Sequence, residues 1–284
     1  VGDSTLDNKH WLFAATETKE AQLRPQPASA ATTAATAHAL NGYEHHLRPP
    51  VMVQDVAFWL NRLAAERLGS QHLVTLNCAV EESTVADRRG GSTLLDADRV
   101  CADTMRDGDV LVLSMGGNDV ALRPSLATAL SMLTLVNSPT WLIRSGWAPG
   151  FGHFERLFGH RQVELAKLLS AASRPRLIVV CALYYLDETP GDSWADRVLS
   201  LLGYNRNPAK LQLVMRTLFE RVSRAGWSVE GTRLAFCPLF EALDGKDPND
   251  YVARVEPSVQ GGRKVAERIL RTIEQEGALE DESR

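Results

Sequence analysis

Amphipathic segments and short apolar segments alternate along the chain. Apolar residues recur at helical spacing in VQDVAFWLNRLAAERLG (residues 53–69), which predicts a helix that ends at Gly69. A further helical segment is expected around residues 96–106. The amphipathic segment GGRKVAERILRTIEQEG (residues 261–277) predicts a closing helix.

Four segments have the short, apolar, β-rich composition of buried strands, and helical segments separate the later ones. This alternation is typical of a parallel sheet with helices on both faces. The pattern therefore predicts an α/β fold, and we expect one domain over residues 1–284. The predicted strands are HLVTLNCAV (72–80), DVLVL (109–113), PRLIVVCALYYL (175–186) and TRLAFCPLF (232–240).

Three parts of the chain depart from this pattern. Residues 9–42 include the polar, Ala/Thr-rich stretch TETKEAQLRPQPASAATTAATAHALNG, which predicts a loop insertion, partly of low complexity. Residues 278–284 are expected to form a frayed tail. The segment VGDST begins where a first strand would end. We therefore expect that this strand is truncated here and that the natural protein extends upstream of Val1 with a short apolar run.

Composition excludes some classes of partner. The chain has 284 residues, 44% of them hydrophobic, a formal net charge of -4 and a pI near 6.0. It has no general basic field, so we expect no nucleic-acid partner. No run of apolar residues is long enough to predict a transmembrane segment. The four cysteines show no CxxC spacing, and three lie in predicted strands, which favours a reducing, intracellular compartment.

Polar clusters follow the predicted strands. They are VGDST (1–5), NCAVEESTVADR (77–88), SMGGNDV (114–120) and LDGKDPNDYVARVEPSVQGG (243–262). Because the carboxyl ends of parallel strands lie at one edge of a sheet, we expect these clusters to converge on one crevice.

In these clusters the chain resembles the SGNH hydrolase (GDSL esterase/lipase) superfamily. Gly2-Asp3-Ser4 matches the first block, with Ser4 at the nucleophile position. Gly116-Gly117-Asn118-Asp119 matches the GxND block, and EPSVQGGRKVAE (256–267) has the shape of the last block. The resemblance spans essentially the whole chain. It implies a three-layer α/β/α sandwich with a flavodoxin-like parallel sheet.

The resemblance also implies acyl transfer on a small-molecule ester, without a cofactor or a metal. Ser4 Oγ would attack the ester carbonyl. The Ser4 backbone N–H, a backbone N–H of the second block and the Asn118 side chain would then stabilise the oxyanion. An Asn amide suits this role because it is a neutral donor with no proton to lose.

Three positions, in the last and the second block, differ from the family pattern. Glu256 stands where the catalytic His is expected, and Ala253 stands where the family has the Asp that orients this His. NCAVEEST (77–84) aligns with the second block of the family, and Glu82 stands there where the family has a Gly. A carboxylate has a pKa of about 4.3 against about 6.5 for imidazole, so Glu256 is a weaker base unless its surroundings raise its pKa.

Glu82 is a candidate for raising that pKa. Two carboxylates in one cleft would share a proton, which would give a Ser4–Glu256 dyad with a tuned base. An ionised Glu82 pointing inward would also oppose the oxyanion. We therefore expect Glu82 to point away, to be neutral or to bind something positive.

Three interpretations follow. In the first, the protein is a serine ester hydrolase whose base is Glu256 or a histidine from elsewhere, with His153, His45 and His46 as candidates. In the second, the fold remains without its chemistry, as a ligand- or protein-binding module. In the third, Glu82, Glu256 and nearby carboxylates hold a divalent cation. The residue spacing gives the third little support, and we predict no metal.

Several other features have simpler interpretations. The second Gly-Asp-Ser, at 191–193, is expected to be a turn before the helical segment WADRVLSLL (194–202). The aspartates of LDGKDPNDY (243–251) lack the spacing of a calcium loop, so we expect a solvated turn, with Asp250 a candidate for orienting the base. For Trp141, Trp147 and Trp194 we expect ordinary packing rather than an apolar wall for an acyl group.

Overall fold

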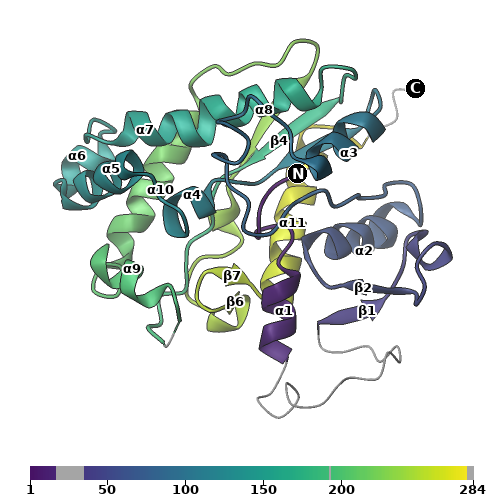
Figure 1. Cartoon of the computed structure of the whole chain (residues 1–284), viewed down its shortest axis with the longest axis horizontal. Helices are drawn as coiled ribbons and strands as arrows, with labels where there is room; N and C mark the ends of the chain where they lie inside the picture. The colour runs from purple at the N-terminus through teal and green to yellow at the C-terminus, as the bar shows by residue number, and fades with distance from the viewer. Residues whose placement is uncertain (17–34, 192, 280–284) are drawn as a thin grey trace.

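A parallel β-sheet forms the centre of the computed structural model, which describes residues 1–16, 35–191 and 193–279 (Figure 1). Its strands lie in the order β3-β4-β5 and pair in parallel along their lengths. The predicted α/β class is therefore confirmed. The strands are β3 (Val110–Leu113), β4 (Leu177–Cys181) and β5 (Arg233–Cys237).

The first residues of the chain extend this sheet beside β3. Ser114 N donates to Val1 O at 3.1 Å, and Asp3 N donates to Ser114 O at 3.0 Å, in a parallel arrangement. On the other side, Val80 N donates to Gly2 O at 3.0 Å. A Cβ on Gly2 would lie 2.2 Å from Ser114 O, so a glycine is needed for this close approach of two backbones. Residues 1–3 thus form the strand end that the sequence predicted.

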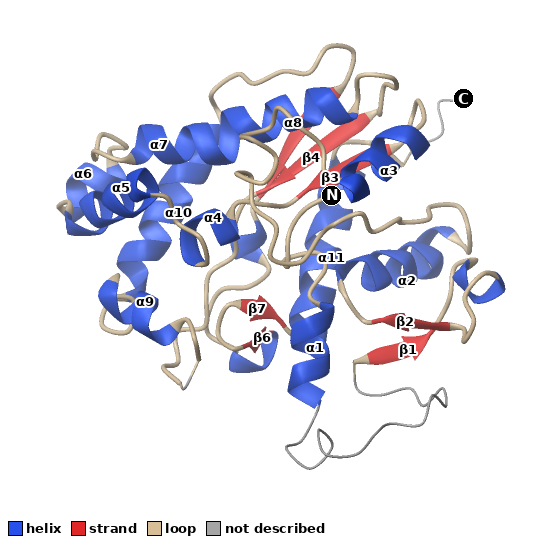
Figure 2. Ribbon diagram, in the orientation of Figure 1, coloured by secondary structure: helices blue, strands red, loops and turns tan. Residues whose placement is uncertain are grey.

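Helices cover both faces of the sheet. The side chains of β4 alternate between two hydrophobic clusters, one on each face. Ile178 and Val180 pack on one side, and Leu177, Val179 and Cys181 pack on the other. Figure 2 shows the resulting layers. On the first side lie α3 (Asp96–Thr104) and α8 (Arg161–Leu169), and on the second α2 (Val56–Leu68) and α11 (Val259–Gln275).

The predicted helices around residues 53–69, 96–106 and 261–277 are confirmed as α2, α3 and α11. The Asp55 side chain caps α2 by accepting from Phe58 N, and the helix ends at Gly69, whose φ is 95°. The Ser258 side chain caps α11 in the same way.

The prediction of a regular strand over residues 72–80 is wrong. Thr75 N and Thr75 O bond to the side-chain amide of Asn61, which is buried in α2. A side chain thus takes the backbone groups that a neighbouring strand would otherwise pair with. At the end of this segment, Val80 N donates to Gly2 O.

The expected loop insertion and frayed tail are each wrong in part. Within residues 9–42, residues 9–16 form a helix and residues 36–38 form a strand; residues 17–34 lie outside the described part of the chain. In the tail, Ala278 is buried and its N–H bonds to Ile273 O, while residues 280–284 lie outside the described part. The elements here are α1 (Lys9–Thr16), β1 (Thr36–His38), η2 (Tyr43–His45) and β2 (Val51–Val53), with β1 and β2 antiparallel.

A group of helices, which we call the helical lobe, lies to one side of the sheet (Figure 1). Between β3 and β4 it contains α4 (Gly117–Ala121), α5 (Leu126–Asn137), α6 (Thr140–Arg144), α7 (Phe151–Glu155) and the π-helix η3 (Arg156–His160). Between β4 and β5 it contains α9 (Asp196–Leu201) and α10 (Pro208–Ser223). The π-helix joins α7 to α8 without a break, and its Phe158 is buried.

A short antiparallel pair completes the fold after β5. Val252 of β6 pairs with Glu256 of β7. The elements between β5 and α11 are η4 (Leu239–Glu241), η5 (Pro248–Asp250), β6 (Tyr251–Val252) and β7 (Glu256–Pro257). None of the helices in the described part of the chain combines the length and apolar character that crossing a membrane requires.

Candidate active site

Ser4 and Glu256 meet at the carboxyl end of the sheet. Ser4 directly follows the sheet residue Asp3, and Glu256 lies in β7, 252 residues further along the chain. Ser4 Oγ donates to Glu256 Oε1 at 3.3 Å, and both residues are buried. The first and last polar clusters of the sequence thus converge.

Asp3 ties the segment carrying Ser4 to the third cluster. Its Oδ1 accepts from Thr5 N and its Oδ2 accepts from Gly116 N, each at 3.1 Å. Gly116 has φ 106°, and a Cβ there would lie 2.7 Å from the Phe158 ring, so this position requires glycine. Burial raises the pKa of the Asp3 carboxyl to about 6.

The backbone on both sides of Glu256 is held in place by side chains. The Asn8 amide donates to Pro257 O, next to Glu256. The turn before β7 contains Ala253 and Arg254, with φ of 49° and 69°. The Arg254 guanidinium is buried and forms an ion pair with Asp196 at the start of α9. Ala253, where the sequence resemblance expects an orienting Asp, thus belongs to a tight turn.

The environment of Glu256 raises the pKa of its carboxyl to about 8. Burial is the largest cause, and the neighbouring charge of Asp3 is the second. The charges of Glu81 and Glu82 raise the pKa less, while the hydrogen bond from Ser4 lowers it. Glu82 thus raises the pKa of Glu256, as the sequence suggested, but Asp3 is the stronger neighbour. Glu256 Oε2 has no hydrogen-bond partner among the described residues.

Asn118 links the second and third clusters. Its side-chain amide donates to Ser83 O at 3.1 Å, and Ser83 Oγ donates to Gly2 O at 3.1 Å. The Asp119 carboxylate accepts from Val85 N at 2.8 Å and thereby holds the following residues against α4. Asn118 lines the same pocket as Ser4. In the described part of the chain, Ser4 N donates to no other group.

Glu82 points away from the site. Its side chain is exposed and lies outside the pocket that Ser4 and Glu256 line. Its backbone is left-handed, with φ 59°, and its carbonyl accepts from Arg123 at 2.7 Å. Its charge therefore does not face a developing oxyanion at Ser4.

The other candidates for base or orienting group lie elsewhere. Asp250 is buried against Lys264 Nζ, at 2.7 Å, and does not contact Glu256. His153 lies in α7, and its ring bonds to the Thr128 hydroxyl of α5 at 3.0 Å. His45 lies in η2. His153, His45 and His46 do not line the pocket. These predicted roles are wrong, because Asp250 and His153 bond to other side chains and none of the three histidines lines the pocket.

Gly191 and Ser193 of the second Gly-Asp-Ser lie just before α9, as the sequence predicted, and not at the site. Ser193 Oγ donates to Ala253 O at 2.5 Å and accepts from Ala195 N, just before α9. The backbone N–H groups of Gly191 and Ser193 both bond to Asp196. Asp192 lies outside the described residues.

A pocket lined largely by the helical lobe opens beside Ser4, and the sequence did not predict it. Apolar residues recur at helical spacing in α10, but that pattern does not distinguish a pocket wall from an ordinary core. Trp194 lines the pocket, contrary to the expected packing role. Trp141 and Trp147 are 70% and 81% exposed, so the same expectation is wrong for them.

Within residues 1–16, 35–191 and 193–279, no group of three or more His, Cys, Asp or Glu side chains is arranged to hold a metal ion. In comparisons with known proteins, the chain matches no family model and no curated protein at a significant level. Function is therefore inferred from the geometry of the site.

Proposed function

We propose that the protein is a serine ester hydrolase, a divergent member of the SGNH superfamily in which Glu256 replaces the catalytic histidine. The observation that carries the proposal is the buried hydrogen bond from Ser4 Oγ to Glu256 Oε1, 3.3 Å long, at the mouth of an apolar pocket. A nucleophile within reach of a base is the basic requirement of covalent acyl transfer. The order of the blocks in the sequence and the layered parallel sheet support the same proposal.

The proposed reaction has two steps. In the first, Ser4 Oγ attacks the ester carbonyl carbon while its proton passes to Glu256; the ester C–O bond then breaks, and the leaving alcohol takes the proton. In the second, water attacks the acyl-serine, gives a proton to Glu256 and forms the carboxylic acid, and the proton returns to Ser4 Oγ. Both steps pass through a tetrahedral oxyanion.

Two donors that line the pocket are assigned to this oxyanion. They are the free N–H of Ser4 and the side-chain amide of Asn118. The sequence resemblance adds a backbone N–H of the second block as a third. Asn118 uses one amide hydrogen on Ser83 O, which fixes the amide and leaves the second hydrogen for the substrate. A donor held in this way needs no reorganisation when charge develops.

The raised pKa of Glu256, about 8, suits it to its role. A carboxylate with an ordinary pKa would accept a serine proton poorly, whereas a pKa close to the operating pH favours general-base catalysis. The deprotonated form is required, so kcat/KM should rise with pH, reach half of its maximum at about pH 8 and level off at higher pH.

The same pKa favours a second candidate function, a ligand-binding module without catalysis. At neutral pH a carboxyl with a pKa of about 8 is mostly protonated and then acts as a hydrogen-bond donor rather than a base. Such a group would bind a carbonyl or hydroxyl oxygen of a ligand. Reactivity of Ser4 distinguishes the two functions.

The deciding experiment treats the purified protein with a fluorophosphonate probe at several pH values from neutral to alkaline. We expect labelling of Ser4 that increases with pH and is absent in Ser4→Ala. Ser193→Ala is the matched control, since it changes the serine of the other Gly-Asp-Ser, and it should be labelled like the wild type. An unlabelled wild-type protein that hydrolyses neither short-chain nor long-chain esters would reject the hydrolase and leave the binding module.

A further inference from the structure

The pocket beside Ser4 is polar at its mouth and apolar elsewhere. Asp3, Ser4, Thr5, Asn118 and Glu256 form the polar part, and the described wall contains two carboxyl groups, those of Asp3 and Glu256. The remaining wall comes mainly from the helical lobe and from residues that follow β4. Counting the mouth that opens to solvent, the empty space measures about 1050 Å³.

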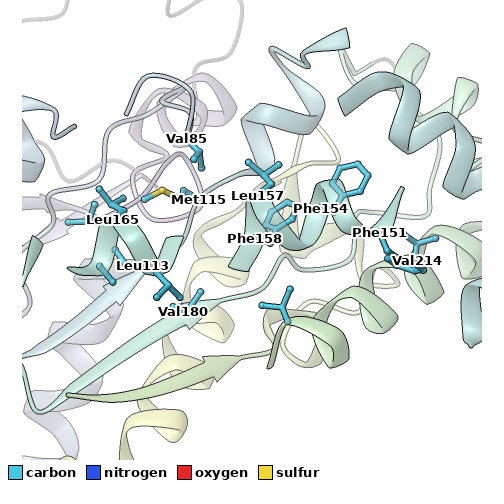
Figure 3. Close-up of a cluster of buried hydrophobic side chains, with 14 of the residues drawn as sticks. Val85, Leu113, Met115, Phe151, Phe154, Leu157, Phe158, Leu165, Val180 and Val214 are labelled. Atoms are coloured by element: carbon cyan, nitrogen blue, oxygen red, sulfur yellow. The ribbon is translucent and has the colours of Figure 1, made fainter. Parts of the chain in front are cut away.

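The apolar part extends away from the proposed nucleophile along the helix formed by α7 and η3. Phe158 lies against Gly116, beside the GxND block. Phe154 stacks on Phe158 with ring centroids 6.4 Å apart, one helical turn further along. Figure 3 shows Val214 of α10 beyond Phe154, on the side away from Met115. Phe158, Phe154 and Val214 all line the pocket, which gives it a near end and a far end.

This wall selects against polar occupants. An apolar cavity offers no hydrogen bonds to water or to a sugar, and filling it with a hydrocarbon removes apolar surface from water. Met132 and Met215 contribute flexible, polarisable side chains, which adapt to a chain of variable shape. A flat or charged acyl group would leave much of the pocket unfilled or would lose its hydration.

We propose that this pocket holds the straight hydrocarbon chain of an acyl group, with the ester carbonyl at Ser4 and the chain end near Phe154 and Val214. The substrate class is then an ester of a medium or long unbranched fatty acid, and Val214 limits the chain length. The inference rests on the proposed function in one respect: it takes Ser4 as the atom that meets the carbonyl. The alcohol part of the ester lies outside the pocket.

The first test measures kcat/KM for p-nitrophenyl esters of acetate, butyrate, octanoate and dodecanoate. Each methylene buried in the pocket should raise kcat/KM about fourfold, so octanoate should exceed butyrate by on the order of 100-fold. A protein that hydrolyses acetate as well as octanoate contradicts the acyl-chain pocket while supporting the hydrolase.

The second test narrows the far end. Val214→Phe should lower the octanoate-to-butyrate ratio of kcat/KM by about tenfold or more, because the added ring fills the space of the chain end. The matched control is Val163→Phe, which changes an equally buried valine of α8 outside the pocket. An unchanged ratio in Val214→Phe, with native circular dichroism, overturns the inference.

A second variant covers the case in which Val214→Phe does not fold. Met132 lines the pocket and is only partly buried, so Met132→Trp is better tolerated and should lower the same ratio. Leu133→Trp is its control, because Leu133 is the next residue of α5, is 38% exposed and does not line the pocket. Equal ratios in these two variants contradict the proposal.

The third test separates the pocket from the chemistry. Binding of 2-decanone and of butanone to Ser4→Ala is measured by calorimetry; these neutral ketones avoid repulsion by Asp3 and Glu256 at the mouth. We expect 2-decanone to bind at least 100-fold more tightly, on the order of fourfold per methylene, and Val214→Phe to weaken it. If Ser4→Ala binds 2-decanone but the wild type hydrolyses no ester, the acyl-chain pocket is supported and the hydrolase is rejected. If the wild type hydrolyses short esters but 2-decanone does not bind, the hydrolase is supported and the acyl-chain pocket is rejected.

Discussion

Two segments bring a glutamate to the carboxyl end of the sheet, and they place it in opposite environments. The second-block loop (residues 80–88) carries Glu82, and the β6–β7 segment (residues 250–258) carries Glu256. Glu82 is exposed, whereas Glu256 is 6% exposed and accepts a hydrogen bond from Ser4. At Glu256, burial raises the pKa of the carboxyl to about 8.

The difference arises from how each backbone is held. At Glu82 the chain has φ 59°, and the exposed Arg123 binds its carbonyl from the solvent side. At Glu256 the chain pairs with β6, and the turn before it is fixed by the buried Arg254. A glutamate thus becomes a candidate base only where backbone pairing and a buried ion pair hold its side chain inside the protein.

The largest expected effect separates the two glutamates by activity. Glu256→Gln should lower ester kcat/KM by about 1000-fold, since a general base contributes on the order of 100- to 10,000-fold. Glu82→Gln changes only an exposed side chain and should leave kcat/KM nearly unchanged. Steady-state kinetics on the best ester measures both. Equal losses in the two variants would show that the buried position of Glu256 is not what matters.

The second effect separates the two arginines by stability. Arg254→Met removes one partner of a largely buried ion pair and should lower the free energy of unfolding by about 2–4 kcal/mol. The Arg123 and Asp87 side chains are 52% and 33% exposed, so Arg123→Met should cost less than about 1 kcal/mol. Urea unfolding followed by circular dichroism gives both values, and similar losses would contradict the contrast between the segments.

The third effect concerns stability against pH. The pKa of Glu256 is about 8 in the folded chain against 4.5 as its ordinary value, so the folded state binds more protons over that range. Stability should therefore be greatest at the acid end and fall as pH rises, by about 1–2 kcal/mol from about pH 6.5 to about pH 8.

Glu256→Gln removes this ionisation, so its unfolding free energy should fall less with pH than that of the wild type. In Glu82→Gln the unfolding free energy should change with pH as it does in the wild type, because the Glu82 side chain stays exposed in the folded protein. Identical slopes in wild type and Glu256→Gln would mean that the carboxyl of Glu256 is not buried in the folded protein.

The smallest effect tests the charge that faces Glu256. After burial, Asp3 is the largest cause of its raised pKa, so Asp3→Asn should lower that pKa and move the acid limb of the kcat/KM profile to lower pH, by about one pH unit. Glu82→Gln should shift the limb less. A larger shift in Glu82→Gln than in Asp3→Asn would contradict the assignment of Asp3 as the stronger neighbour.

The core of the fold was predictable because local patterns encode it. The three apolar strands and the helices α2, α3 and α11 agree with the periodicity of the sequence. The extended segment 72–80 was mistaken for a strand because a buried Asn61 satisfies its backbone, and composition does not reveal such a partner. The helix α1 and strand β1 lie in or beside a low-complexity stretch that shows no clear period.

The candidate site was predictable in its residues but not in their roles. Ser4, Asp3, Gly116, Asn118 and Glu256 do converge, as the order of the polar clusters indicated. The orienting role considered for Asp250 and the role of base considered for His153 were wrong, because each has a closer partner that only the packing provides.

The sequence alone determined the alternation of strands and helices, the glycine that lets two backbones approach at Gly2, and the identity of the residue at each position of the site. Tertiary structure decided which carboxylate is buried, which charge faces it and where the apolar pocket lies. The physical reason is distance along the chain. Burial and pKa depend on contacts such as that between Ser4 and Glu256, 252 residues apart, which local periodicity does not encode.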